Sequence, residues 1–468
     1  MEMHTPSKTA IWVTAVVAAL VLLGAALVPA GASAAKTKTF RSVDRTARTL
    51  VFAPRHVKPQ SVRSAVVRLR SNGRTKVRSV SAAKVRRVAA NRAKLHVRSG
   101  AARGKLEVKI LAVPPPAEDP PTDPSCVWGA FDATNQPGAC WRPYSDSSPF
   151  NVGVGSGPRE VTNSSSIVSR TLGLGTAGAR GGTMFTVGTS GTSSDYDHPI
   201  YYSKPSDPVY TVRCRKWVSS CTVEGLQIRI PAAAQPAGGS DGHLAVIDQD
   251  AGWEYGFWET EARSPSGGTL WIGHGGRTPI GTPDATGLGS SDLANNVTAA
   301  HFGLAAGVVR PEELGAGQIN HALFMTVKCT NGTYVWPARG PGVGRTCASM
   351  GLSNENAPAL GQHFYLEMTA AEIDALSVPA WKKTILRAMT EYGMFVGDTG
   401  SSTMGWNIVL QSGSSYTSFG QPDPWVGLAK QFGIPQSSGG KYYFDLKDTI
   451  DWAAEMRVAD PCVSRRAC

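Results

Sequence analysis

The sequence predicts a mainly β protein with a few peripheral helices. Its main body is expected to be a disulfide-stapled β-sandwich or jelly-roll-like domain, preceded by a small N-terminal β-module. Three observations predict this class. The 468 residues include 51 Gly and 31 Pro, which favour many turns and short strands over long helices. Several segments alternate apolar and polar residues with a period of two, and eight cysteines are present.

Residues 1–34 are interpreted as a secretory signal peptide. An apolar run over residues 9–28 follows Lys8, and Ala32-Ser33-Ala34 supplies a small-residue cleavage pattern. At about 20 residues the run is also long enough to remain in the bilayer as an uncleaved anchor. The expected location is extracellular, with cell-wall association as an option, and an even number of cysteines in an exported chain favours disulfides.

Residues 36–112 are predicted to form a basic β-sandwich module, with a short helix over residues 81–90 as an option. The module has 22 Lys and Arg residues against Asp44 and Glu107, hence a formal net charge of +20. Because the whole chain carries +12 and Glu2 and Lys8 cancel, residues 113–468 carry −8. Such a charge favours binding to an anionic cell-wall polymer, an acidic polysaccharide or a membrane surface. Nucleic acid is not expected outside the cell, and a basic module without a partner is the alternative.

Residues 113–125 are rich in proline and predict an extended linker, because proline cannot donate ladder hydrogen bonds. The cysteine-containing main domain then covers residues 126–468. The simplest disulfide pattern joins neighbours along the chain, as four pairs. These pairs are Cys126 with Cys140, Cys214 with Cys221, Cys329 with Cys347, and Cys462 with Cys468.

In the main domain, alternating patterns predict strands over residues 200–202, 209–213, 226–230, 319–327 and 394–400. Helices are expected in three places. One starts at the capping box Thr369–Glu372 and ends before Pro379. The second covers residues 381–392, where Gly393 can close it, and the third opens at Asp423-Pro424 and runs to about residue 432.

The clearest element is a β-hairpin over residues 239–260. Its two strands flank a four-residue loop, residues 249–252, and Asp248 is expected to pair with Trp253. Leu244 then faces Phe257 and Val246 faces Tyr255, which gives one apolar face that must be buried. The opposite face carries polar residues and is interpreted either as a solvated surface or as the floor of a polar cleft.

Four residues are candidates for catalysis. Asp241 and His243 stand two apart, so both side chains leave one face of the strand, where the Asp can orient the His as a general base. Asp398 follows a strand and lies in a Gly-flanked loop, which makes it the best second acid. His198 precedes the strand that carries two tyrosines. Structural hydrogen-bonding roles remain the alternative for each residue.

Five further residues are candidates for binding substrate. They are Trp258, Tyr201, Tyr202, Asp197 and Glu254. Glu254 is too far from Asp241 to be its catalytic partner, because six residues of strand span roughly 20 Å, whereas glycosidase carboxylates lie roughly 5 to 10 Å apart. No zinc-site spacing or phosphate-binding loop is present, so neither a metal nor another cofactor is expected.

The stretches DHPIYY (197–202), SDGHLAVID (240–248), WEYGFWE (253–259), INHALF (319–324) and YGMFVGDTG (392–400) resemble a family of secreted proteins from soil actinobacteria with no assigned activity. The likeness covers nearly all of residues 140–460. It implies one integral domain and gives no activity.

These features predict a secreted polysaccharide-active enzyme, a glycoside hydrolase or a polysaccharide lyase, acting on an extracellular or cell-wall glycan. In the lyase alternative, Tyr and His would serve as acid and base. A non-catalytic carbohydrate-binding protein of the wall or matrix is the competing interpretation. No stable protein partner is predicted.

Overall fold

A computed structural model describes residues 126–175, 184–281, 285–288, 296–340, 344–400 and 405–468, together with the backbone of seven earlier strands. The chain divides into two compact units, Met1–Thr122 and Asp123–Cys468. The predicted signal peptide and the predicted linker lie outside the described residues. Among those described, no helix is long and apolar enough to span a membrane.

The first unit contains two antiparallel sheets. One has the order β1-β7-β3-β4 and the other the order β2-β6-β5. The strands are β1 (Thr37–Arg41), β2 (Thr49–Phe52), β3 (Ser64–Ser71), β4 (Arg74–Ser81), β5 (Val85–Ala89), β6 (Arg92–His96) and β7 (Lys105–Leu111). The optional helix over residues 81–90 is wrong, because Val85–Ala89 is a strand paired with β6.

The second unit confirms the predicted mainly β class, a β-sandwich-like domain with few helices and four disulfides. Its described part has 14 strands in four sheets. The central sheet has the order β15-β13-β12-β9. These strands are β9 (Ile200–Ser203), β12 (Leu244–Asp248), β13 (Trp253–Trp258) and β15 (His274–Pro279). The hairpin register is as predicted, with Asp248 opposite Trp253 and Leu244 opposite Phe257.

Both faces of the central sheet are buried over most of their length. On one face, Val246 and Phe257 pack against the sheet β11-β10-β14 and form the core of a two-layer sandwich. This second sheet contains β10 (Val209–Cys214), β11 (Gln227–Arg229) and β14 (Gly268–Ile272). On the other face, Ala245 and Ile247 join the larger core. Polar residues on that face include the buried Glu254 and Thr278, and His243 and Trp258 at the end of the strands.

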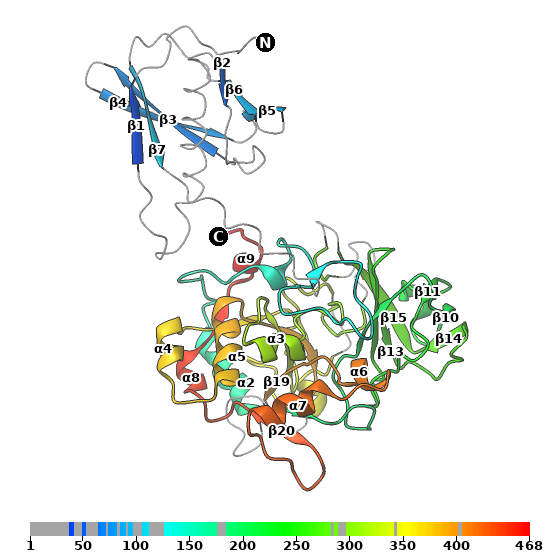
Figure 1. Cartoon of the computed structure of the whole chain (residues 1–468). Coiled ribbons are helices and arrows are strands. Elements are labelled where there is room, and N and C mark those ends of the chain that lie inside the picture. Colours follow the sequence, from blue (N-terminus) through cyan, green and yellow to red (C-terminus); the bar gives the residue numbers. More distant parts are fainter. Residues whose placement is uncertain are drawn as a thin grey trace, which may run out of the picture. The chain divides into compact units, whose positions relative to one another are not determined.

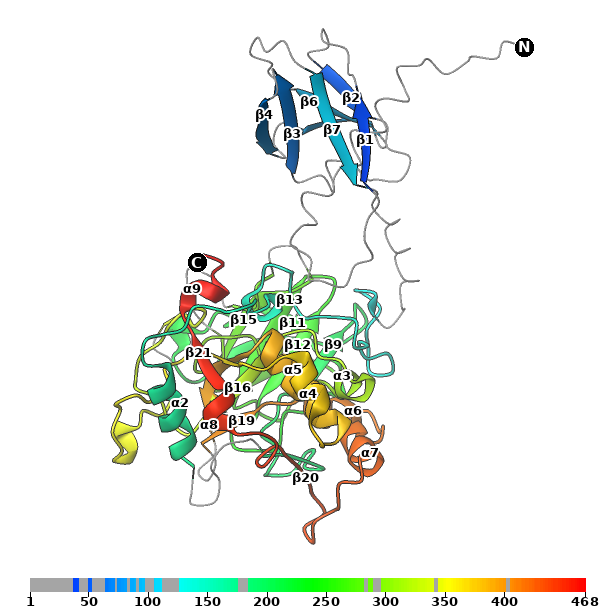
Figure 2. The same cartoon turned by 90° about the vertical axis from the view of Figure 1, so that its left-hand side faces the viewer.

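A five-stranded sheet of order β19-β16-β18-β17-β21 shares the larger core. Its strands are β16 (Leu323–Val327), β17 (His363–Leu366), β18 (Met394–Thr399), β19 (Trp406–Ile408) and β21 (Met456–Ala459), and β8 (Met184–Val187) pairs separately with β20 (Tyr442–Asp445). In Figures 1 and 2, helices α4 and α5 lie on the opposite side of the domain from β10, β11 and β14.

Two of the helices pack along this sheet, one against β21 and one against β17. The described α-helices are α2 (Ser164–Gly173), α3 (Pro311–Ala316), α4 (Ala370–Ala375), α5 (Ala380–Glu391), α6 (Ser414–Thr417), α7 (Pro424–Gln431), α8 (Trp452–Glu455) and α9 (Pro461–Ser464). The capping box at Thr369 and Glu372 is present. Gly393 ends α5 at a left-handed φ of 75°, and Asp423 caps α7. Helix α2 was not predicted, because it lies within a stretch rich in Gly, Ser and Thr.

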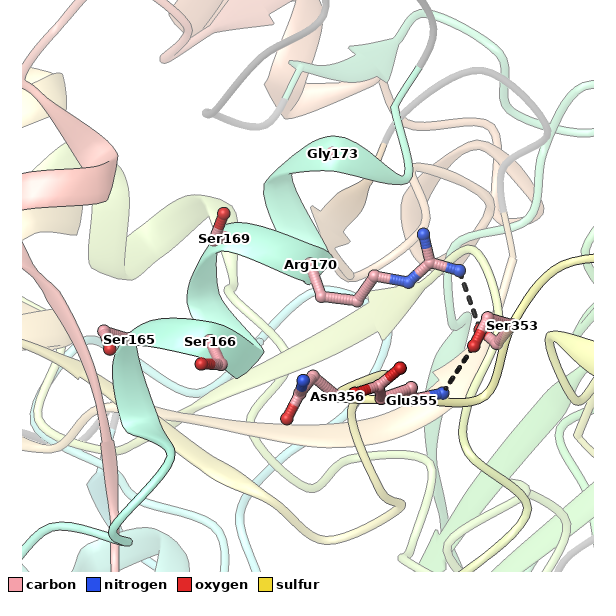
Figure 3. A pocket seen from close by; sticks show the side chains of 8 residues that line it. All are labelled: Ser165, Ser166, Ser169, Arg170, Gly173, Ser353, Glu355 and Asn356. Carbon is pink, nitrogen blue, oxygen red and sulfur yellow. Dashed lines mark hydrogen bonds between the residues drawn. The ribbon is translucent and has the colours of Figure 1, made fainter.

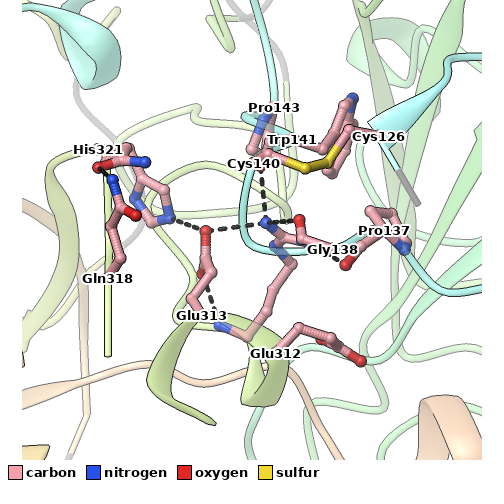
Figure 4. Close-up of polar contacts among 12 residues, drawn as sticks. Cys126, Pro137, Gly138, Cys140, Trp141, Pro143, Glu312, Glu313, Gln318 and His321 are labelled. Atoms are coloured by element: carbon pink, nitrogen blue, oxygen red, sulfur yellow. Dashed lines mark hydrogen bonds and ion pairs between the residues drawn. A yellow bond between two sulfur atoms is a disulfide. The ribbon is translucent and has the colours of Figure 1, made fainter. Parts of the chain in front are cut away.

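A buried ionic network anchors the first segment of the domain. Arg310 donates to Glu313 at 2.9 Å and to the carbonyl oxygens of Pro137 and Trp141, each at 2.7 Å. Nε2 of His321 lies 3.1 Å from the same Glu313 carboxylate. Figure 4 shows this network beside the Cys126–Cys140 disulfide. All four predicted disulfides are present.

Candidate functional site

Four ring side chains lie side by side across one end of the central sheet, in the order His198, His243, Trp258 and His274, and are called the row of rings below. His198 directly precedes the Pro199–Ile200 entry to β9, and His243 directly precedes β12. Trp258 ends β13 and pairs with His274 at the start of β15. Because Ala245 pairs with Ile200, the residues two positions earlier, His243 and His198, are also neighbours. Their rings meet edge to face with centroids 5.0 Å apart.

His198 and His243, two of the three histidines in this row, are buried and neutral at physiological pH. Burial lowers the pKa of His198 to about 3, with a further contribution from His243, and burial lowers the pKa of His243 to about 4. His198 Nδ1 lies 2.7 Å from the carbonyl oxygen of Leu304. A carbonyl only accepts, so Nδ1 carries the proton and Nε2 is the free acceptor. His243 Nδ1 has no hydrogen-bond partner in the part of the chain that the structure describes.

Asp398 enters the same site from the five-stranded sheet. Its Oδ2 accepts the backbone N–H of Ala299 at 3.0 Å, and its Oδ1 accepts that of Thr399 at 2.6 Å. Burial, with a smaller contribution from the charge of Asp241, raises the pKa of Asp398 to about 6, against the lowering effect of the two backbone hydrogen bonds and of Arg345. Asp398 keeps part of its surface accessible. A carboxyl group in this state can carry a proton in weakly acidic solution.

A β-bulge lies next to Asp398 in β18. Met325 pairs with Val396 and Thr326 pairs with Asp398, so Gly397 is an extra residue in β18. A Cβ on Gly397 would lie 2.2 Å from the ring of Phe324, so only glycine fits there. The ring of Phe324 in turn contacts that of His198, with centroids 5.4 Å apart. One aromatic side chain thereby connects the two sheets at the site.

Asp241 is the shared neighbour of the other polar groups. Its charge raises the pKa of Asp398 and opposes the lowering of the pKa of His198. The indole Nε1 of Trp258 donates to Asp241 Oδ1 at 3.3 Å. The structure therefore brings together the four predicted catalytic residues, with Trp258 beside them. Asp241 and Trp258 are both partly accessible to solvent.

Three further residues at this end of the sheet were not predicted. Trp217 stacks on Trp258 and meets His274 edge to face. His301 lies near enough to His274 for the two charges to interact, and burial lowers its pKa to about 4. His301 and Trp217 both have left-handed backbones, with φ of 64° and 47°. Such strain in a non-glycine residue is concentrated at functional sites. Nothing in the local sequence pattern of these residues indicates that they meet.

Two of the predicted substrate-binding residues belong to the core instead. Tyr201 is 1% exposed, and its hydroxyl donates to the carbonyl oxygens of Gln235 and Ser414. Tyr202 is 3% exposed and packs against Phe131 in the other core cluster. The alternation of the strand is real, but both faces of the sheet are covered, so neither ring can contact a substrate.

The remaining two predicted residues, Glu254 and Asp197, are hydrogen-bonded to other parts of the domain. Glu254 is 0% exposed; it accepts from the Tyr144 hydroxyl at 2.5 Å and from the Ala305 backbone N–H at 2.9 Å. Asp197 accepts the backbone N–H of Leu410 at 3.2 Å. Burial and the charge of nearby Asp195 raise the pKa of Asp197 well above its usual range. Both carboxyl groups therefore have structural partners.

A separate surface pocket lies beside α2. It is lined by Ser165, Ser166, Ser169, Arg170, Gly173, Ser353, Glu355 and Asn356. Figure 3 shows Arg170 reaching the Ser353 carbonyl oxygen, a bond of 2.7 Å. None of the four residues in the row of rings lines this pocket, and neither do Asp241 and Asp398. In the described ranges, no group of three or more His, Cys, Asp or Glu side chains is arranged to hold a metal ion.

No protein-family profile, curated protein or solved structure matches this chain. The geometry of the site alone therefore carries the functional proposal. The four disulfides are of the kind typical of extracellular proteins.

Proposed function

We propose that this protein is a secreted glycoside hydrolase acting on an extracellular or cell-wall polysaccharide. The observation that carries the proposal is the pair Asp241, in the turn before β12, and Asp398, near the end of β18, which interact electrostatically in a partly accessible site. Glycoside hydrolysis requires two carboxyl groups on either side of the scissile bond, one protonated and one ionised. The raised pKa of Asp398 assigns the protonated role to that residue.

Asp398 is the general acid in this proposal. Its raised pKa keeps a proton available in weakly acidic solution, and that proton passes to the glycosidic oxygen as the bond to the anomeric carbon breaks. Asp241 is the second carboxyl group and acts ionised on the opposite side of the sugar. It either takes a proton from the water molecule whose oxygen bonds to the anomeric carbon, or bonds to that carbon itself until water replaces it. The Trp258 indole N–H fixes the orientation of Asp241. The unprotonated Nε2 of His198 is suited to hold a hydroxyl group of the sugar or a water molecule.

The lyase alternative has less support. β-Elimination from a uronic acid needs an acid for the leaving oxygen as well as a base, and Tyr201 and Tyr202 were the predicted acids. Both hydroxyl groups lie in the core. A non-catalytic glycan-binding protein remains the second candidate, because the half-exposed ring of Trp217, stacked on Trp258 at the site, is an aromatic surface of the kind that stacks sugars. The N-terminal module would contribute by binding anionic wall polymers through its net charge of +20.

The test is to incubate the purified protein with neutral and acidic polysaccharides while following reducing ends and the absorbance of unsaturated uronates together. Hydrolysis produces reducing ends without absorbance. D398N and D241N are each expected to lower the rate at least a hundredfold, as loss of a positioned acid or base does. D250N, at the exposed tip of the same hairpin, is the matched control and keeps full activity.

Retention of full activity in D398N and D241N would contradict these assignments. Binding of a polysaccharide with no cleavage under any condition would favour the binding protein instead. Circular dichroism and the melting temperature of each variant establish that it is folded.

A further inference from the structure

The loop closed by the Cys214–Cys221 disulfide is fixed against the end of the central sheet. The backbone N–H of Arg215 donates to Ile272 at 2.9 Å, and that of Lys216 donates to Gly273 at 2.8 Å. Lys216 also forms an ion pair with Glu259 at 2.7 Å. Three anchors and a disulfide hold this short loop, so its next residue, Trp217, is presented in a defined position.

Trp217 covers the outer end of the row of rings. Its indole stacks on Trp258 with centroids 5.8 Å apart and planes at 19°, and it meets the His274 ring at 5.7 Å and 80°. Half of its surface is exposed. Because one face of the indole lies on Trp258, the exposed surface belongs to the other face and the ring edge.

Folding alone does not explain this tryptophan. A left-handed φ of 47° is accommodated by glycine without strain, yet the position holds the largest side chain. Burial does not explain it either, since the ring is half exposed. Trp271 on the neighbouring strand offers a contrast. It is 40% exposed, but the guanidinium of Arg215 lies over its ring at 4.5 Å, whereas no cation lies over Trp217 among the residues that the structure describes.

We propose that the exposed face of Trp217 is a sugar-stacking subsite that extends the binding site outward from Trp258 and His274, so that the substrate is a polysaccharide chain bound along the row. The inference rests on the proposed glycan specificity. Trp217 lies against both Trp258 and His274, with ring centroids 5.8 and 5.7 Å away. Because the indole N–H of Trp258 donates to Asp241, a ligand that extends from Asp241 to the exposed face of Trp217 must pass both stacked indoles. A longer oligosaccharide is therefore expected to reach Trp217 more readily than a disaccharide.

The test uses linear oligosaccharides of two to eight units, built from β-1,3-glucose, β-1,4-glucose, N-acetylglucosamine or galacturonate. In the wild-type protein, oxidation of each Trp by N-bromosuccinimide is followed by peptide mass spectrometry. The longer members of one series are expected to protect Trp217 and the disaccharide is not. Trp271 serves as the internal control and keeps its reactivity.

The variant W217A is expected to weaken binding of the longest oligosaccharide roughly three- to tenfold, the range of an aromatic contact, and to leave the disaccharide unchanged. V218A, the adjacent residue in the same loop and 48% exposed, is the matched control, and W217F should restore most of the affinity. Protection that is absent for every oligosaccharide, or equal for Trp217 and Trp271, would overturn the subsite. Protection without any cleavage would retain the subsite and refute the hydrolase, so the two failures are distinguishable.

Discussion

The indole N–H of Trp258 donates to Asp241 over 3.3 Å and so connects the end of β13 with the segment that precedes β12. The hairpin brings these residues together, since Leu244 pairs with Phe257 immediately inside them. The bond restricts the rotation of a partly exposed carboxylate that interacts with both Asp398 and His198. The β12–β13 hairpin thus orients Asp241, whereas Asp398 comes from β18, which is distant in the sequence.

Replacing Trp258 by Phe removes the hydrogen bond and keeps an aromatic ring beside Trp217. We expect kcat/KM to fall roughly tenfold, the value of one hydrogen bond to a charged group. The effect should vanish in the D241N background, because the carboxylate that this hydrogen bond orients is absent there. W253F, at the opposite end of the same strand, is the control and leaves kcat/KM unchanged. An equal loss in both backgrounds would show that Trp258 acts independently of Asp241.

The raised pKa of Asp398 predicts the pH dependence of the rate. A general acid must be protonated, and with a pKa of about 6 its protonated fraction falls tenfold for each pH unit above that value. We expect kcat/KM to decline above pH 6, measured with the polysaccharide that gives activity. In R345A the descending limb should move to higher pH, since Arg345 opposes the raised pKa. A rate that increases through pH 6 would instead require Asp398 to act ionised.

The hairpin register could be predicted from sequence because it depends on local alternation and a short loop. The meeting of His198 with His243 depends on a parallel pairing between β9 and β12, across 45 residues. The Gly-flanked position of Asp398 is visible in the sequence. Its position in the strand pairing depends on a bulge at Gly397, against which the ring of Phe324 packs. Trp217 and His274 meet only through tertiary structure, so no sequence spacing reveals them.

Tyr201 and Tyr202 show where prediction from the sequence pattern fails. Alternation predicts that Tyr201 and Tyr202 point to different faces, and they do, since each belongs to a different core cluster. It does not show that both faces are covered. The burial of Glu254 could not be predicted for the same reason, because its hydrogen-bond partner Tyr144 is 110 residues away in the sequence. Polar side chains on a strand therefore indicate a site only when the packing above them is known.

Glu254 is expected to act in stability and not in catalysis. Y144F leaves the buried carboxyl group without one partner, which should lower the free energy of unfolding by about 1–3 kcal/mol. E254Q, which keeps an acceptor for the Ala305 N–H, should cost less than Y144F. Urea unfolding measures both values, and the activity per folded molecule should match that of the wild-type protein. A loss of activity in E254Q without a loss of stability would return Glu254 to the site.

The Arg310 network provides the largest expected change in stability. Arg310 and Glu313 are both about 1% exposed, so R310M leaves a buried carboxylate with only His321 and backbone groups around it. Such a change costs about 3–5 kcal/mol. R387A is the matched control, because its ion pair with Asp374 is exposed and should contribute less than about 1 kcal/mol. Equal losses of unfolding free energy in the two variants would contradict the structural role of the network.

The same network predicts that the free energy of unfolding falls at low pH. The neighbouring Arg310 and His321 lower the pKa of Glu313 to about 2 against the opposing effect of burial. A carboxyl group whose pKa is lower in the folded than in the unfolded state stabilises the protein above its unfolded value, near 4.5. That contribution is lost as the pH falls towards 2. In E313Q the unfolding free energy should therefore change less between pH 5 and pH 2.5 than in the wild-type protein, and an unchanged difference would exclude Glu313 as its source.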